Sequence, residues 1–224
     1  MQLITITGGR TLHGRIRPAA AKNSVLPLLA ATLLCRTPSR LRAVPPLADV
    51  ATSLALLQSV GAKAERQGSD LFVAPGQDLQ GEIPDYLAGA MRSSVFYLAP
   101  LLCRVGEVRL PLPGGCKLGP RPVDIHLAGL AAMGAQVELE GIAVTLRRRG
   151  PLHGVDFALR LPSVGATMTL MMAATQAGGT TILRGAACEP EICDLANFLR
   201  ACGAHITGAG TPVVVIQGGK PLQG

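Results

Sequence analysis

The chain contains 224 residues, of which 48% are hydrophobic and 16% charged, and this is enough apolar material for a large core to exclude an intrinsically disordered protein. Aromatic residues make up only 3%, which argues against a protein that binds single-stranded nucleic acid by stacking bases on rings. The formal net charge of +7 favours anionic partners such as phosphorylated metabolites, nucleic acid or acidic membranes.

In chain order, residues 1–7 are typical of an edge strand and too short for the apolar region of a secretion signal. Residues 161–183 carry no charge and are long enough to span a bilayer, but their five threonines and Gly178-Gly179 favour a buried helix followed by a strand. Without an export signal, the six cysteines are expected to be reduced thiols. Cys188 and Cys193 lack the spacing of a zinc motif. We therefore expect a cytoplasmic globular protein without a metal or cofactor, and no membrane partner.

A repeated phrase divides the chain into three parts. A helical pattern ends in Gly-Ala at residues 61–62, 134–135 and 203–204, spaced by 73 and 69 residues, which indicates a glycine in the left-handed conformation before a strand. A more apolar helix precedes each of these helices, at 23–34, 92–103 and 165–177. Strand-like segments lie at 41–44, 71–73, 107–112, 136–139, 143–146, 180–183 and 213–216. The predicted unit is helix, strand, helix, strand, strand, repeated three times with pseudo-threefold symmetry. A HEAT-type helical repeat is the alternative, but its period is shorter and it lacks strands.

The stretch 112–126 is the most informative for chemistry. Its glycines and prolines predict a surface loop, and Cys116 lies on that loop near Lys117 and Arg121. Nearby cations lower a thiol pKa towards the reactive thiolate, although a structural thiol on a loop is the alternative. His126 either faces the same site or serves in capping or packing.

The starts of the three apolar helices form a second candidate site. Lys22-Asn23, Arg92 and Ser163-Val164-Gly165 occupy corresponding places in the three repeats. Helix N-termini attract anions, so threefold symmetry could bring these starts to one phosphate- or carboxylate-binding patch. Capping at solvated edges is the alternative. The acidic segment 189–194 favours compensation of a helix dipole over acid–base catalysis.

With these motifs, the sequence resembles the enolpyruvyl transferase family, in the branch that acts on UDP-N-acetylglucosamine. The matching phrases are Ala21-Lys22-Asn23, Met91-Arg92-Ser93-Ser94, Pro113-Gly-Gly-Cys116, Gly119-Pro-Arg121-Pro-Val-Asp124-Ile-His126, Ser163-Val-Gly-Ala-Thr167, Glu189-Pro-Glu191 and Gly208-Ala-Gly210. The resemblance implies an α/β (α+β) domain of three βαβαββ units. It also implies transfer of the enolpyruvyl group of phosphoenolpyruvate to the sugar 3-hydroxyl, in the first committed step of peptidoglycan synthesis.

The resemblance also implies roles for individual residues. Cys116 would be the general acid at the enol methylene and the position alkylated by fosfomycin. Lys22, Arg92 and Arg121 would hold phosphoenolpyruvate. The UDP-sugar would contact Asn23, Arg121, Pro122, Val123, Asp124, Ile125, Ser163, Val164 and Gly165. Where some members carry a lysine before the Ser-Val-Gly turn, this chain has Arg160, which could supply the diphosphate cation.

The family enzyme is about twice as long, with its site between two domains. We therefore expect residues 1–17 to form a strand that pairs with an absent second domain. Residues 18–224 would form the cysteine-loop domain, with repeats at about 18–85, 86–156 and 157–224. The chain would be inactive without its second half, which a separate subunit or self-association could supply. A non-catalytic UDP-sugar-binding module is the alternative, and a nucleic-acid binder is disfavoured because no recognised motif accompanies the basic pI.

Overall fold

The computed structural model describes residues 3–16, 21–111 and 123–224. Its strands form three sheets, in the orders β1-β3-β2, β4-β6-β5 and β7-β8-β10-β9. The strands are β1 (Ser39–Leu41), β2 (Lys63–Gln67), β3 (Asp70–Ala74), β4 (Glu107–Pro111), β5 (Gln136–Glu140), β6 (Ala143–Arg147), β7 (Asp156–Ala158), β8 (Thr180–Arg184), β9 (His205–Thr207) and β10 (Val213–Gln217). The predicted order of helix, strand, helix and hairpin is confirmed three times, and each such unit forms one sheet, which β7 extends at the edge of the third.

Pairing within the sheets follows one plan. The first strand of each unit pairs antiparallel with the last strand of its hairpin, as β1 with β3, β4 with β6 and β8 with β10. In two units a segment that precedes the first strand also pairs with it in parallel. Strand β7 lies beside β8, and Glu82 forms an isolated β-bridge with Arg109 of β4. In the first unit the parallel bridge joins Cys35 to Leu222, near the other end of the chain. The third unit thus returns to the start of the first.

The second helix of each unit is α2 (Ala48–Ser59), α5 (Asp124–Ala132) or α7 (Pro190–Ala201). Each ends at the repeated glycine, with φ of +94° at Gly61, +103° at Gly134 and +106° at Gly203. After each glycine, the alanine N–H donates to a helical leucine carbonyl five residues earlier, at 2.9–3.0 Å. These two features define a Schellman cap, so the predicted helix ends are confirmed three times.

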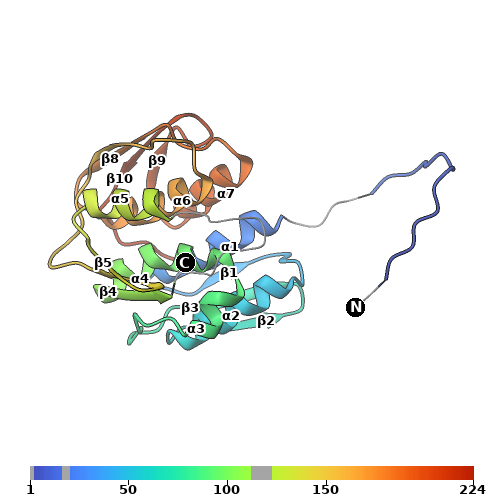
Figure 1. Cartoon of the computed structure of the whole chain (residues 1–224), viewed down its shortest axis with the longest axis horizontal. Helices are drawn as coiled ribbons and strands as arrows, with labels where there is room; N and C mark the ends of the chain where they lie inside the picture. Colours follow the sequence, from blue (N-terminus) through green and yellow to red (C-terminus); the bar gives the residue numbers. More distant parts are fainter. Residues whose placement is uncertain (1–2, 17–20, 112–122) are drawn as a thin grey trace.

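The first helices of the units form the centre of the molecule (Figure 1). They are α1 (Lys22–Ala31) with η1 (Thr32–Leu34), η2 (Arg92–Tyr97) with α4 (Leu98–Val105), and α6 (Val164–Gln176). From Ala166 to Thr175 every residue of α6 is buried, as expected for a helix that is apolar all round. The helix predicted at 92–103 begins instead as a 3-10 helix. Pro100 lacks an N–H donor, and the α-helix starts at Leu98, which places Pro100 in its tolerated first turn.

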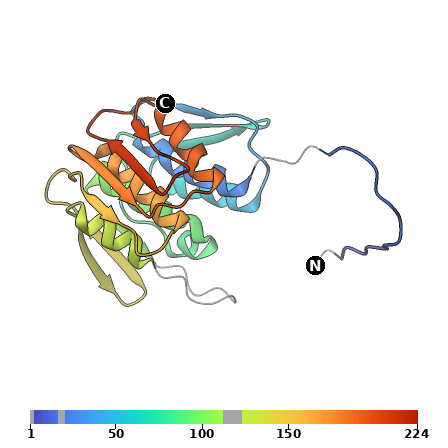
Figure 2. The ribbon, with the colours of Figure 1, turned by 90° about the horizontal axis from the view of Figure 1, so that it is seen from above.

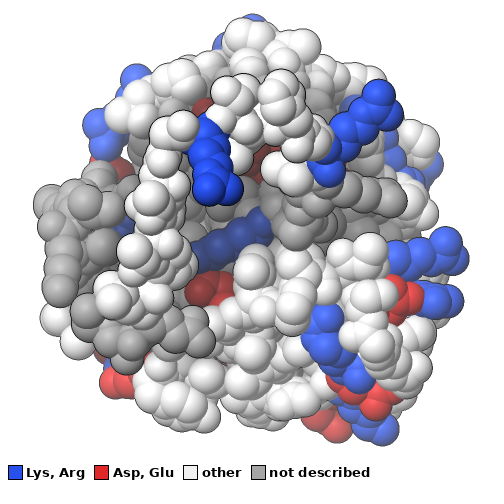
Figure 3. All heavy atoms as spheres, turned by 90° about the vertical axis from the view of Figure 1, so that its right-hand side faces the viewer, with Lys and Arg blue, Asp and Glu red and all other residues white. Residues whose placement is uncertain are grey.

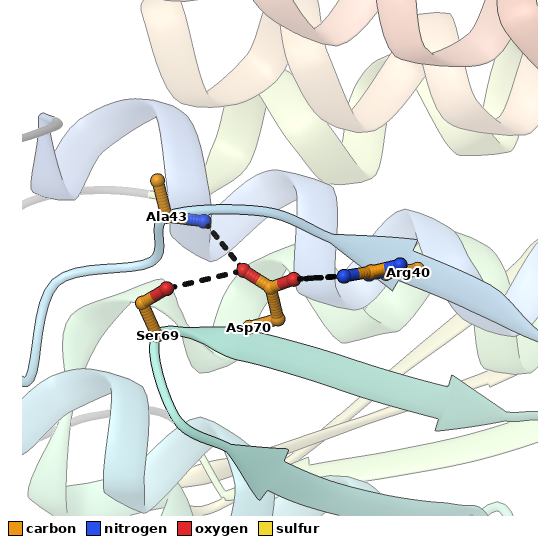
Figure 4. Close-up of polar contacts among 4 residues, drawn as sticks. All are labelled: Arg40, Ala43, Ser69 and Asp70. Atoms are coloured by element: carbon orange, nitrogen blue, oxygen red, sulfur yellow. Dashed lines mark hydrogen bonds and ion pairs between the residues drawn. The ribbon is translucent and has the colours of Figure 1, made fainter.

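The sequence pattern placed the strand after the first helix at 41–44, two residues late at its start and three at its end, and it missed helix α3 (Asp85–Ala90). Strand β1 ends at Leu41 because the chain turns at Ala43, whose φ is +53°. Asp70 holds this turn (Figure 4): its carboxylate accepts the Ala43 N–H at 3.0 Å and the Arg40 Nε–H at 2.9 Å. These bonds lower the pKa of Asp70.

Residues 3–16 lie away from the folded body (Figures 1 and 2) and form no strand. The edge strand predicted at the start of the chain is therefore wrong for residues 3–7 of this structure, because none of its three sheets lies beside them. Leu12 and Ile16 are 93% and 94% exposed. Pairing of this segment with a second domain stays a prediction. None of the helices within 3–16, 21–111 and 123–224 is both long and apolar enough to cross a membrane.

Candidate active site

Helix α1 begins at a polar junction with α2 and α7. Lys22 forms an ion pair with Asp49 in the first turn of α2. The Asn23 amide donates to Glu191 at 3.3 Å, and the Ser24 hydroxyl donates to Asp194. Because these contacts join the first turns of α1 and α7, the two N-termini lie side by side. We call this cluster the α1 junction.

The Lys22–Asp49 pair is accessible to an incoming anion. The two side chains are 52% and 31% exposed, and an ion pair of this kind contributes at most about 1 kcal/mol to stability. Lys22 could therefore exchange the Asp49 carboxylate for a ligand phosphate at a small cost in free energy.

Helices α5 and α6 form a second junction at their own N-termini. Asp124, the first residue of α5, forms an ion pair with Arg160, three residues before the cap of α6. The Ser163 hydroxyl accepts the Ala166 N–H at 3.3 Å and so caps α6. Further into the contact, the His126 ring lies against Gly165, where an added Cβ would be 2.8 Å from Nε2. We call this cluster the α5–α6 junction.

His126 is buried, with 7% of its surface exposed, and neither ring nitrogen has a hydrogen-bond partner within residues 3–16, 21–111 and 123–224. Burial lowers its pKa to about 4, although the charge of Asp124 acts in the opposite direction. The imidazole is therefore neutral at pH 7. Of the alternatives left open by the sequence, packing at the α5–α6 junction is what the structure shows. Any relation to Cys116 lies outside the described residues.

Helix η2 contacts both α1 and α6, so the element that begins with Arg92 lies between the two junctions. Arg92 is partly buried, and within the described parts of the chain its side chain forms no ion pair or hydrogen bond. The neighbouring Ser93 hydroxyl is buried and has no hydrogen-bond partner in the part of the chain that the structure describes. No hydrogen bond or ion pair among the described side chains joins the α1 junction directly to the α5–α6 junction.

Three predicted site residues, Cys116, Arg121 and Pro122, lie outside the described residues. Of the others, Val123 is the N-cap of α5 and partly buried, whereas Ile125 is 6% exposed and belongs to the core. A ligand at this end of α5 would therefore meet the Ile125 backbone rather than its side chain. Val164 and Gly165 begin α6 and are partly buried.

The molecule is hollowed on the side that Figure 3 shows, with a Lys or Arg side chain inside the hollow and an acidic side chain next to it. Cationic and acidic groups in a concave surface suit the binding of an anionic ligand. Within the described ranges no group of three or more His, Cys, Asp or Glu side chains could hold a metal ion.

Sequence reasoning missed Asp49 as the partner of Lys22. An acidic residue in the first turn of a helix is ordinarily explained by the helix dipole, so no local signal marked this contact. The expected dipole compensation at α7 is present, with Pro190 at the helix start and Glu191 in the first turn. The contact from Asn23 to Glu191 was not predicted. Arg160, expected to be a diphosphate cation, is paired with Asp124 in this structure.

The model of the family described as EPSP synthase (3-phosphoshikimate 1-carboxyvinyltransferase) matches residues 6–224. A protein named UDP-N-acetylglucosamine 1-carboxyvinyltransferase from Cellvibrio japonicus is 45% identical over 100% of this chain and 54% of its own length. One with the same name from Gloeobacter violaceus is 47% identical over 99% of the chain and 48% of its own length. The chain thus spans about half the length of the curated relatives it matches.

Solved structures share the fold. The enolpyruvyl transferase NikO from Streptomyces tendae superposes with a TM-score of 0.82 and 24% identity, over 96% of this chain and 51% of its own. An EPSP synthase from Acinetobacter baumannii superposes with a TM-score of 0.75 and 17% identity, over 94% of this chain and 48% of its own.

Proposed function

The chain belongs to the EPSP synthase family, and from this membership we propose that it is the cysteine-loop half of a UDP-N-acetylglucosamine 1-carboxyvinyltransferase. The reaction would transfer the enolpyruvyl group of phosphoenolpyruvate to the 3-hydroxyl of UDP-N-acetylglucosamine and release phosphate. The observation that carries this proposal is identity of 45–47% to proteins of that name over 99–100% of the chain.

The charges at the helix starts support a binding site for these substrates. Phosphoenolpyruvate carries a phosphate and a carboxylate, and we assign their binding to Lys22 and Arg92 together with Arg121. The ion pair of Lys22 with Asp49 shows that this ammonium group can hold a carboxylate. Phosphate and carboxylate groups are natural partners of such cations.

The capped start of α6 supports a diphosphate site. Its first N–H groups point to the end of the helix where Ser163, Val164 and Gly165 lie, and unpaired N–H groups at a helix N-terminus favour anions. We assign the diphosphate to this position, with Arg160 next to it, and the uridine to Pro122, Val123, Asp124 and the Ile125 backbone. Asn23 would contact the sugar.

Cys116 would be the catalytic acid. Protonation of the methylene carbon of phosphoenolpyruvate makes the adjacent carbon electrophilic, and the sugar 3-hydroxyl attacks it. Loss of phosphate and of a methyl proton then regenerates the enol ether on the sugar. The positive charges of Lys22, Arg92 and Arg121 would stabilise the departing phosphate.

The chain spans about half the length of its relatives, and we propose that it is inactive without the other half. Its place would be the cytoplasm, where the reaction would commit UDP-sugars to the cell wall. A second polypeptide or a second copy of the chain would have to complete the site.

Phosphate release is the test. The chain would be joined after Gly224 to the second half of the Gloeobacter violaceus relative and assayed with phosphoenolpyruvate and UDP-N-acetylglucosamine. We expect turnover by the fusion, none by the chain alone, and none by a Cys116→Ser fusion. Shikimate 3-phosphate should not replace the UDP-sugar as acceptor.

If the fusion used shikimate 3-phosphate as acceptor and did not use the UDP-sugar, the substrate assignment would be overturned. Turnover by the unfused chain would overturn the requirement for a second half. Calorimetry addresses the alternative of a non-catalytic module. Tight binding of the UDP-sugar to the unfused chain, with no turnover by the fusion, would favour that module.

A further inference from the structure

Two buried cysteines meet at the far end of the helix pair that forms the α1 junction. Cys35 follows η1 in the first unit, and Cys202 is the C-cap of α7 in the third unit. Their Sγ atoms are 3.6 Å apart although 167 residues separate them in sequence. Cys35 is fully buried and Cys202 is 6% exposed. Both are free thiols in the structure.

Backbone contacts on both sides hold the two cysteines in place. The Arg36 N–H donates to the Leu222 carbonyl at 2.8 Å, and the Gln223 N–H donates to the Cys202 carbonyl at 2.9 Å. The Arg104 guanidinium donates to the Cys35 carbonyl at 3.0 Å. The segment around Leu222 therefore ties the first unit to the third directly at the two thiols.

The surroundings make the two thiols chemically unequal. The pKa of Cys35 is lowered, chiefly by the Cys202 thiol that faces it, and the charge of Arg104 adds to this although burial opposes it. The pKa of Cys202 is raised by the same contact and by burial. The contact thus favours ionisation of Cys35 over ionisation of Cys202. Cys103 offers a contrast, because burial raises its pKa to about 12.

We propose that Cys35 and Cys202 are a site of reversible oxidation, at which a small hydroperoxide converts the two thiols into a disulfide between the first and third units. The Cys35 thiolate would attack a peroxide oxygen to give a sulfenic acid and hydroxide. The Cys202 thiol would then attack the sulfenic sulfur, forming the S–S bond and releasing water. The two sulfurs together lose two electrons, which the peroxide accepts. Because Cys35 is fully buried and Cys202 only 6% exposed, the oxidant has to be small enough to enter the protein, which a hydroperoxide is and a protein disulfide is not.

The position of the pair suggests what the bond would do. Helices α1 and α7 run in the same direction, with their starts joined by Asn23 and Glu191 and their far ends facing each other through the two cysteines. A covalent bond at the far ends would fix the helix that carries Lys22 and Asn23 against its neighbour. It would also close a very long loop of chain, which constrains the unfolded state.

Mass spectrometry of the 224-residue chain is the first test. After treatment with hydrogen peroxide, the protein would be unfolded, alkylated with N-ethylmaleimide and digested. We expect a peptide pair that links Cys35 to Cys202 and disappears after dithiothreitol. The unfolding midpoint should rise by about 5–10 °C on oxidation. Repeating the experiment in a Cys116→Ser chain removes any contribution from the loop cysteine.

The matched controls are Cys202→Ser and Cys188→Ser. The first should abolish both the linked peptide and the rise in midpoint, whereas the second should leave both intact because Cys188 is exposed while Cys35 and Cys202 are buried against each other. Recovery of Cys35 and Cys202 as alkylated thiols, under conditions in which another cysteine has been oxidised, would overturn the proposal. Because this readout uses the unmutated protein, it does not depend on the folding of any variant.

Discussion

The two junctions hold their helix starts together by different kinds of contact. At the α1 junction, each polar side chain at the helix start has a partner on a neighbouring helix: Lys22 with Asp49, Asn23 with Glu191 and Ser24 with Asp194. At the α5–α6 junction one exposed ion pair joins Asp124 to Arg160. Deeper in this junction the fit is steric, because the His126 ring fills the space that Gly165 leaves, and its nitrogens find no hydrogen-bond partner among the described residues.

Because of this difference, we expect the two junctions to bind an anion in different ways. The α1 junction carries its own counter-charges, so a ligand must replace carboxylates. The α5–α6 junction has one exposed ion pair, Asp124 with Arg160, beside the capped start of α6, so a ligand there would meet helix N–H groups and a single paired cation. Charge substitutions should therefore affect ligand binding at the first junction, and size substitutions should affect stability at the second.

The largest effect is expected from Lys22→Ala in the fusion described above. Loss of the cation that holds the phosphoenolpyruvate phosphate should lower kcat/KM for phosphoenolpyruvate by about 100-fold. Steady-state phosphate release measures it. Lys63→Ala, which removes a lysine on the exposed edge strand β2, is the control and should retain full activity. Equal losses in the two variants would contradict a specific role for Lys22.

The second prediction concerns pH and the α5–α6 junction. The pKa of His126 is about 4 in the folded chain and about 6.5 in an unfolded one. The unfolded state therefore binds the extra proton first, and stability falls as the pH drops from about 6.5 to about 4. The loss should approach about 3 kcal/mol, measured by urea unfolding across this range.

His126→Leu should flatten that pH dependence, while His205→Gln, a change at an exposed position, should preserve it. The same slope in His126→Leu as in the unchanged protein would assign the effect to other groups. Asp70 does not interfere, because its lowered pKa places its own loss of stability below about pH 4.

Gly165→Ala tests the steric fit directly. The new Cβ would lie 2.8 Å from His126 Nε2, so the ring must move, and we expect a loss of about 1–3 kcal/mol in unfolding free energy. Gly89→Ala in α3 is the control, because its Cβ would meet no atom within 4 Å. That change should stabilise by about 0.4–1 kcal/mol.

A double variant sharpens the result. If the clash with His126 causes the loss, Gly165→Ala should cost much less in a His126→Ala background. If Gly165→Ala lowered the unfolding free energy equally in both backgrounds, the loss would have a cause other than the clash with His126.

The smallest effect is expected from Ser24→Ala at the α1 junction. It removes the hydroxyl that donates to Asp194 and should lower the unfolding free energy by about 1 kcal/mol. Thermal unfolding of Ser24→Ala and of Thr52→Ala, which removes a bond within α2 only, provides the comparison. A loss confined to Thr52→Ala would show that the contact between α1 and α7 does not contribute.

Much of the fold could be predicted because its signals are local. Gly61, Gly134 and Gly203 end their helices through backbone conformation alone, which the repeated Gly-Ala phrase records. The order of elements followed from the same phrase. The start of the helix at Leu98 was missed because Pro100 was not weighed as a helix breaker.

The site was predictable only in part. Lys22, Asn23 and Ser163 were identified because they begin helices, but their partners come from distant segments. No periodic pattern links Lys22 to Asp49 or Cys35 to Cys202, since pairing between polar or thiol side chains depends on how the units close on each other. The burial of His126 was similarly open, because its neighbour Gly165 lies in another unit.

The parallel course of α1 and α7 has an electrostatic consequence. Each helix start bears the equivalent of about half a positive charge, and two such ends side by side repel each other. Glu191 and Asp194 bring negative charge to this point from α7, and Asp49 brings it from α2. These carboxylates therefore neutralise the two helix starts in the protein alone, and a phosphorylated ligand that bound here would have to take over that neutralisation from them.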